Sequence, residues 1–327
     1  MKKAVLVALL LGLAALTFVV ARAGAGSVLV LLSHSGWLLL AMIPLHGLPL
    51  LPDAVGWRAL IDGEARLPRL YWIATVRQAI NRLLPVASIG GELVGIRLLV
   101  RGGVGRPEAV ASVIVEVFIT LVSEYLFVMA GVLCLLSITG AVQIIHGILI
   151  GLLVTLPAVL ILALLLRHGT FFERLHQGAV KLFGEALAGS ISSDAGARMD
   201  SEIRELSRAY PRQLRALSWQ FAGMLTGCLE TWCALHWFAP GFSFAAAVVL
   251  ESLTQAARHI FFIVPAGVGV QELSFIGVGH LLGIGPDVAL AVSLARRGSE
   301  IVFGVPALVS WQWSEGRRLF GIGKTGA

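Results

Sequence analysis

Long apolar runs with few charged residues limit what this chain can fold into. They lie at 4–20, 28–51, 109–138, 148–166, 217–238, 244–264 and 288–313, with weaker segments at 71–99 and 273–284. A helix needs about 20 apolar residues to cross a hydrocarbon layer about 30 Å thick. Backbone groups in lipid must be satisfied within the segment, so helices are the expected form. We therefore expect an all-α integral membrane protein, with about six full transmembrane helices.

The composition agrees with this expectation and excludes several other classes. Of the 327 residues, 57% are hydrophobic and 13% are charged, whereas soluble domains carry about 25% charged residues. The net charge of +6 comes from basic residues beside the apolar runs, which favours membrane orientation over nucleic-acid binding. Cys134, Cys228 and Cys233 lie inside apolar runs and read as buried small hydrophobes. We expect no metal, no cofactor and no catalytic residue, and hence no enzyme.

The N-terminal segment 1–26 has two readings. Lys2 and Lys3 precede an apolar stretch that ends in Ala21-Arg22-Ala23, as in a secretory signal. We favour an uncleaved transmembrane helix over a cleaved signal.

Arginine and lysine counts predict the orientation. The basic segment 167–215 should be a cytoplasmic linker, and 171–186 within it has helical apolar spacing. That stretch reads either as an amphipathic helix on the inner leaflet or as a connecting helix packed on the protein. Three further segments are basic and should also be inside: 52–69, 97–106 and the tail 316–327. Two segments lack Lys and Arg and should be outside: 139–146 and 239–243. We expect a multi-pass protein of the bacterial inner (plasma) membrane with both termini cytoplasmic.

Two segments should enter the membrane and return. Segment 71–99 has cytoplasmic flanks on both sides, and 244–284 should start and end outside, so both are predicted to be re-entrant hairpins. Shifting the chain by 180 residues aligns LPVASIGGE with VPAGVGVQE and VGRPEAVA with IGPDVALA. Segments 27–166 and 216–315 therefore read as two membrane repeats of opposite orientation, as in inverted-repeat transporters.

Charged residues surround both predicted helix breaks. Arg77, Asn81 and Arg82 precede the first break, and Glu92 follows it. Arg258 precedes the second break and Glu272 follows it, while Arg296, Arg297 and Glu300 lie in the last run. The residues expected to break the helices are Pro85, Gly90, Gly91, Pro265, Gly267 and Gly269.

This pattern predicts a substrate site for an anion. Helix starts favour negative charge, and the arginine fork matches phosphate oxygens in pairs. The alternative is that the acids and arginines neutralise one another as buried ion pairs that fix helix packing. For Glu116, Glu124 and Glu230 both interpretations stay open.

Three stretches resemble a known family. They are NRLLPVASIGGELVGIRLL, QAARHIFFIVPAGVGVQELSFIGVGHLLGI and ALAVSLARRGSEIVFGVPAL. The chain is similar to the flippase-like transmembrane domain of lysylphosphatidylglycerol synthases, and most similar to stand-alone members associated with hopanoid biosynthesis. The resemblance implies lipid handling in the inner membrane by paired hairpins that meet near the midplane. It does not imply synthase activity, because the chain has no stretch long enough for the aminoacyl-transferase domain.

The favoured interpretation is a lipid flippase or lipid-transport protein. The resemblance adds an expected link to hopanoid biosynthesis or transport. Its partners would be membrane lipids with an anionic headgroup, or hopanoids, together with lipid-biosynthesis enzymes. Two alternatives stay open: an intramembrane lipid-modifying enzyme that uses Glu272 or Glu300, and an accessory subunit of a lipid-synthesis complex.

Overall fold

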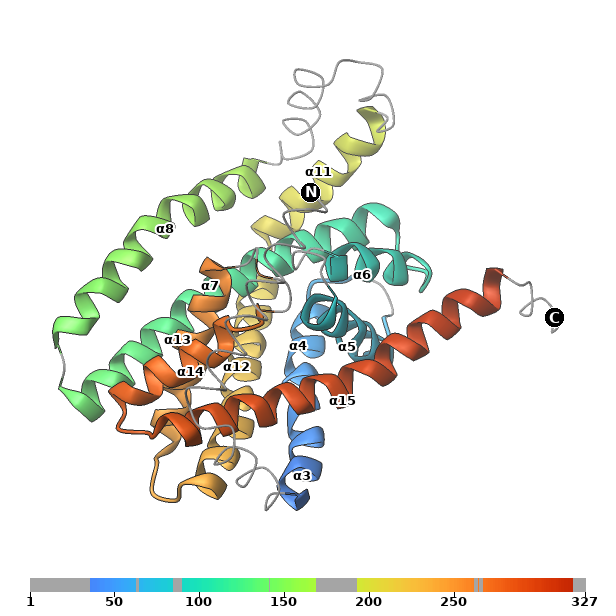
Figure 1. The fold of residues 1–327 in the computed structure, drawn as a ribbon. Coiled ribbons are helices and arrows are strands. Elements are labelled where there is room, and N and C mark those ends of the chain that lie inside the picture. The colour runs from blue at the N-terminus through green and yellow to red at the C-terminus, as the bar shows by residue number, and fades with distance from the viewer. Residues whose placement is uncertain are drawn as a thin grey trace.

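A computed structural model describes residues 36–62, 65–84, 90–140, 142–168, 193–261, 264 and 267–319. These residues form helices joined by turns and contain no strand (Figure 1). The helices are α3 (Gly36–Gly47), α4 (Leu50–Arg58), α5 (Leu67–Leu83), α6 (Gly90–Val100), α7 (Arg106–Thr139), α8 (Val142–His168), α11 (Ser193–Arg208), α12 (Tyr210–Phe238), α13 (Phe244–Ile260), α14 (Val270–Leu281) and α15 (Pro286–Leu319). The predicted all-α class is therefore confirmed for the described residues.

Several expectations fall outside these residues. They concern the N-terminal helix 1–26, the surface helix 171–186, the tail beyond 319, and the two prolines Pro85 and Pro265. The described part of the linker is α11, which packs on the protein against α7 and α8. Its Ile203 is fully buried with Ala111 of α7 and Leu166 of α8.

The same order of helix lengths occurs twice along the chain. Helices α5, α6 and α7 have 17, 11 and 34 residues, and α13, α14 and α15 have 17, 12 and 34. Both long helices start just after a glycine, with a proline in the first turn, where its fixed φ suits a helix start. The element pattern therefore follows the spacing of the two aligned sequence segments.

The two sets of helices pack across each other. Helix α5 packs along α15, and α13 packs along α7, while α5 also contacts α6 and α13 contacts α14 (Figure 1). Helix α12 contacts α3, α4, α7, α13 and α15. Each long helix thus packs along the first short helix of the other set and contacts the second short helix of its own set.

Two apolar clusters form much of the core, and each includes residues from both sets of helices. One cluster gathers around Trp57, Ile73 and Leu98, and the other around Leu250 and Phe275. Large apolar side chains also cover the outside, which is typical of a lipid-facing surface. Those on α7, α8 and α15 include Leu126, Met129, Leu133, Leu153, Leu160, Leu164, Val302, Val305 and Val309.

Helix α7 is the one described helix that is both long and apolar enough to span a bilayer by itself. The other long helix of the pair, α15, carries Arg296, Arg297 and Glu300 within its apolar stretch. Helices α5, α6, α13 and α14 have fewer than 18 residues. The expected total of about six spans stays a prediction.

The described part of the apolar run at 28–51 is interrupted and does not form one continuous helix. Helix α3 ends at Gly47, and α4 begins at Leu50 and extends to Arg58, inside the segment expected to be a cytoplasmic loop. Pro49 is the N-cap of α4. A proline has no N–H to donate and suits the start of a new helix, which accounts for the interruption.

Candidate functional site

Arg77 joins the two helices of the first short pair, α5 and α6, and also reaches α7. Arg77 of α5 pairs with Glu92 at the start of α6, and its Nη2 lies 2.8 Å from Oε2 of Glu116 on α7. Asn81 donates to Glu92 and accepts from the backbone N–H of Gly91 at 2.9 Å. The Arg77 guanidinium also lies 4.5 Å from the ring centroid of Trp57. Arg77 is thus already neutralised by carboxylates.

Glycine at positions 91 and 95 permits this close packing. A Cβ at Gly91 would lie 2.6 Å from the backbone oxygen of Arg77, and a Cβ at Gly95 would lie 2.6 Å from Cδ of Arg77. Both distances are shorter than van der Waals contact. The glycines therefore let α6 approach α5 closely enough for Glu92 to reach Arg77.

The second helix break is organised by Glu272. Its Oε2 accepts from the backbone N–H of Gly269 at 2.8 Å, and its Oε1 lies 2.7 Å from Nε of Arg297 on α15. Gly269 has φ +82° and Gly267 has φ +58°, values that favour glycine. Glu272 is fully buried, so both of its oxygens find partners inside the protein.

The two sets of helices meet at Glu300. Its Oε1 lies 3.3 Å from Nη1 of Arg258 on α13 and 3.7 Å from Nη1 of Arg82 on α5. The Glu300 side chain is 4% exposed, that of Arg258 13% and that of Arg82 26%. We call Arg82, Arg258 and Glu300 the arginine junction.

The arginine junction carries more positive than negative charge. Among the described residues, Glu300 is the acid with which both Arg82 and Arg258 form ion pairs. Arg258 also donates to Oε1 of Gln271 at 2.6 Å, and Gln271 donates to Ser293. Four arginines lie close enough to Glu300 to act on it electrostatically: Arg82, Arg258, Arg296 and Arg297.

Arg296 belongs to a separate buried group of polar side chains. It pairs with Glu251, and its Nε lies 3.6 Å from Oε2 of Glu230. The same Glu230 oxygen lies 3.0 Å from Nδ1 of His46. Thr231 donates to Glu251. Arg296 is therefore matched by two acids.

Sequence reasoning did not find the pairing of His46 with Glu230. These residues are separated by 184 positions, and His46 stands alone at the end of an apolar run. It is 5% exposed and also packs edge-on against Phe303, 5.7 Å between ring centroids. A polar residue within an apolar run, which needs a buried partner, was the available signal.

Glu124 on α7 has partners from the second half. It accepts from Gln255 at 3.4 Å and lies 3.2 Å from Nε2 of His259, both on α13. Glu116 and Glu124 thus contact different neighbours, since Glu116 contacts Arg77.

A narrow depression borders the arginine junction. It is lined by His46, Gln78, Ala79, Arg82, Glu300, Phe303 and Gly304. No water-sized sphere fits inside it. The junction is therefore nearly closed in this conformation.

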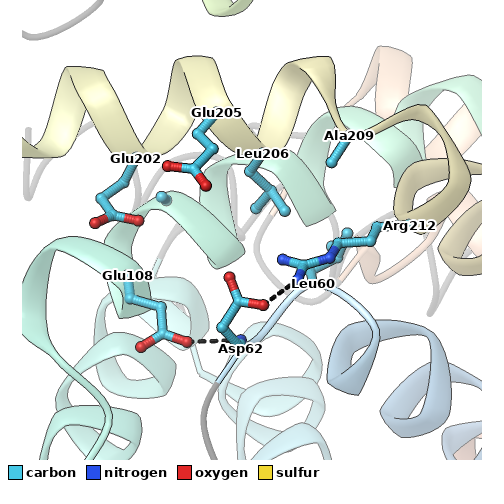
Figure 2. A pocket seen from close by; sticks show the side chains of 9 residues that line it. Leu60, Asp62, Glu108, Glu202, Glu205, Leu206, Ala209 and Arg212 are labelled. Atoms are coloured by element: carbon cyan, nitrogen blue, oxygen red, sulfur yellow. Dashed lines mark hydrogen bonds and ion pairs between the residues drawn. The ribbon is translucent and has the colours of Figure 1, made fainter.

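A larger pocket of about 250 Å³ lies elsewhere, where α11 and the start of α12 meet α7 (Figure 2). It contains four acids: Asp62, Glu108, Glu202 and Glu205. Arg212 pairs with Asp62 and holds its pKa below the usual value, while burial and then the nearby acids raise the pKa of Glu202. This pocket is acidic and separate from the arginine junction.

The surplus of positive charge lies at the arginine junction. Arg77, Arg296 and Arg297 each have one or two carboxylate partners of their own, whereas Arg82 and Arg258 share one. Asn81, Glu92 and Gly91 form contacts within the first helix pair, where Gly90 begins α6. Glu272, Gly267 and Gly269 form contacts at the second break.

Comparison with known protein families identifies the family of this chain. The family model described as "Lysylphosphatidylglycerol synthase TM region" matches residues 5–307. No curated protein and no solved structure matches the chain. Because the match covers most of the chain, and the described residues form helices with an apolar outer surface, this protein is a membrane protein of the lysylphosphatidylglycerol synthase transmembrane-region family.

Proposed function

We propose that this protein moves lipids between the two leaflets of the bacterial inner membrane. Family membership ties the chain to lipid modification or transport. The observation that carries the more specific proposal is the arginine junction, where residues from both sets of short helices converge on Glu300. A site at the meeting point of two repeated halves suits alternating access.

The proposed substrate is a lipid with a phosphate headgroup. Arg82 and Arg258 share one carboxylate, which leaves a net positive charge in an interior where isolated charge is costly. Guanidinium groups form paired hydrogen bonds with phosphate oxygens. A phosphodiester could thus replace Glu300 between the two arginines. A hopanoid substrate rests on the family resemblance alone.

The proposed mechanism is an exchange between two inverted halves. Helix α5 packs on α15 and α13 on α7, so movement of one set of short helices changes its packing against the long helix of the other. The depression at the arginine junction admits no water-sized sphere, which fits an occluded state of such a cycle. The proposal includes a cytoplasmic location for both termini.

Reconstitution into vesicles tests this function. The protein is placed in vesicles that contain a fluorescent, tail-labelled phosphatidylglycerol, and the fraction that a membrane-impermeant quencher can reach is followed over time. We expect Arg258→Ala to lose lipid movement, and Arg82→Ala to reduce it at least tenfold. Arg101→Ala is the matched control, because Arg101 pairs with Glu315 away from the junction. Equal rates in wild type and in the Arg82→Ala and Arg258→Ala variants would refute the site.

Cysteine labelling tests the inverted arrangement. Single cysteines at positions 85 and 265, in a background without the native cysteines, are treated with a membrane-impermeant maleimide from each side. The proposal expects labelling from the cytoplasmic side at 85 and from the outer side at 265. Labelling of both positions from one side would contradict an inverted repeat.

A second candidate function is that of an accessory subunit in a lipid-synthesis complex. Two observations favour it: most buried acids have a basic partner, as Glu116, Glu251 and Glu272 do, and the depression at the junction is narrow. Vesicles that contain this chain alone separate the two functions, since a subunit without transport activity leaves the labelled lipid in place. An intramembrane lipid-modifying enzyme would change the mass of the lipid, which mass spectrometry of the same vesicles detects.

A further inference from the structure

Glu300 has one oxygen in the arginine junction and one that is buried without a hydrogen-bond partner. Oε1 faces Arg82 and Arg258, whereas Oε2 has no partner among the described residues. Buried carboxylate oxygens usually have a partner. Ionised Glu300 therefore depends on the two arginines that face its other oxygen.

A phosphate that binds Arg82 and Arg258 would remove this support. The Glu300 side chain is only 4% exposed, so water cannot replace the arginines around it. Arg296 and Arg297 remain near Glu300, but each is already paired with another acid. Burial therefore disfavours the displaced carboxylate, which binds a proton instead. Protonation needs only one H⁺ from water, and it forms the carboxylic acid at Glu300 with no change in electron count.

The charge at the arginine junction supports this exchange. With Glu300 ionised, two arginines and one carboxylate give a net charge of about +1. With a phosphodiester bound and Glu300 protonated, two arginines and one phosphodiester anion give the same net charge. Without the proton, the two arginines, the phosphodiester and the Glu300 carboxylate would have no net charge. The Glu300 carboxylate would then be ionised but displaced from Arg82 and Arg258.

The groups that face Glu300 leave it as the site of protonation. Arg82 comes from α5, Arg258 from α13, and Arg296 and Arg297 from its own helix. His46 of α3 lines the same depression but is held by Glu230 of α12. Glu272 of α14 is held by Arg297. Glu124 of α7 also lies near enough to Arg82 for an electrostatic interaction, but its contacts are with Gln255 and His259 of α13. Among these acids, Glu300 is the one whose ion pairs a bound phosphate would replace.

We propose that Glu300 couples lipid movement to protons: a phosphate headgroup displaces Glu300 from Arg82 and Arg258, and Glu300 takes up one proton as it is displaced. This inference rests on the proposed lipid transport. Lipid anion and proton would then cross together without net charge. An acidic vesicle lumen should drive the anionic lipid from the inner to the outer leaflet.

Proton uptake on binding is the first test. Purified protein in a weakly buffered detergent solution with a pH indicator is mixed with short-chain phosphatidylglycerol, or with dimethyl phosphate as a headgroup analogue without acyl chains. Wild type and Glu300→Asp should take up about one proton per bound molecule, and Glu300→Gln should bind without proton uptake. Glu315→Gln, whose carboxylate pairs with Arg97 and Arg101 away from the junction, should behave as wild type.

The two probes distinguish a lipid site from a free-phosphate site. Uptake with phosphatidylglycerol alone assigns the site to lipid headgroups, and equal uptake with dimethyl phosphate assigns it to phosphodiesters in general. Binding by wild type without proton uptake would overturn the coupling and leave the proposed transport intact. Failure of wild type to bind either probe or to move lipid would instead remove the proposed function.

A pH gradient in vesicles is the second test. With an acidic lumen, wild type should accumulate the labelled lipid in the outer leaflet beyond equal distribution. Glu300→Gln should reach equal distribution with and without the gradient, because its neutral amide cannot exchange a proton. Accumulation by Glu300→Gln to the wild-type level would refute a proton-coupling role of Glu300. If Glu300 had only a structural role, its replacement would not selectively abolish the accumulation that the pH gradient drives.

Discussion

Arg297 on α15 lies 2.7 Å from Glu272 at the start of α14, and this ion pair joins the second helix break to the long helix behind it. Glu272 is fully buried and also accepts from the backbone N–H of Gly269. The Glu272 side chain therefore accepts from the N-cap backbone N–H of α14 and neutralises Arg297.

Removal of Glu272 should destabilise the protein strongly. Glu272→Ala leaves Arg297 without its carboxylate in a buried position, which costs about 3–5 kcal/mol. Thermal unfolding in detergent, followed by tryptophan fluorescence, measures the loss. The double variant Glu272→Met/Arg297→Met removes both charges and should recover part of the stability. A single variant as stable as wild type would mean that the pair contributes little.

The close contact of α5 and α6 makes a second prediction. Gly91→Ala places a methyl group 2.6 Å from the backbone oxygen of Arg77, and overpacking of this kind costs about 1–3 kcal/mol. Gly277→Ala on α14 is the matched control, because nothing lies within 4 Å of its Cβ position. Thermal unfolding should show a lower midpoint for Gly91→Ala alone. Equal midpoints for the two variants would show that α6 can shift without cost.

The acidic pocket should respond to pH through Asp62 and Arg212. Arg212 lowers the pKa of Asp62 by a hydrogen bond. The stabilisation is therefore fully present above the unfolded pKa of about 3.9 and is lost as pH falls through the lower folded value. Both side chains are substantially exposed, so the contribution is below about 1 kcal/mol.

Unfolding of wild type and Asp62→Asn at pH 7 and at pH 3 measures this contribution. The variant should be slightly less stable at pH 7, and the difference should shrink towards pH 3. A difference that grows at low pH would contradict the direction of the Asp62 pKa.

Local chemistry in the sequence indicated where helices are interrupted. Two described helices end at Leu83 and Ile260, and the next ones begin at Gly90 and Val270, which agrees with the recurring spacing of glycines and glutamates. The roles predicted for Pro85 and Pro265 stay predictions. Glu92 and Glu272 were expected near arginines, and both have an arginine partner. These features depend on residues close together in the chain.

The particular pairings could not be predicted because they depend on tertiary packing. Arg82 and Arg258 are equally basic in the sequence, but only the crossing of α5 over α15 brings Arg82 to the same acid as Arg258. Arg77 and Arg296 look like equal candidates for anion binding, yet each is matched by two carboxylates. The sequence shows which charges need partners and does not show which partners they find.

A disulfide across the depression tests whether the two halves must separate. A Cβ at Gly304 of α15 would lie 3.3 Å from Cβ of Ala79 on α5, close to the Cβ separation of disulfides, about 3.5–4.5 Å. The variant Ala79→Cys/Gly304→Cys, in a background without the native cysteines, should form the bond on mild oxidation. Because both residues line the depression beside Arg82 and Glu300, the bond holds α5 against α15. We expect oxidised vesicles to lose lipid movement and reductant to restore it, while Gly304→Cys alone should not respond to oxidation. Unchanged movement in fully cross-linked protein would mean that the lipid crosses without separation of α5 from α15.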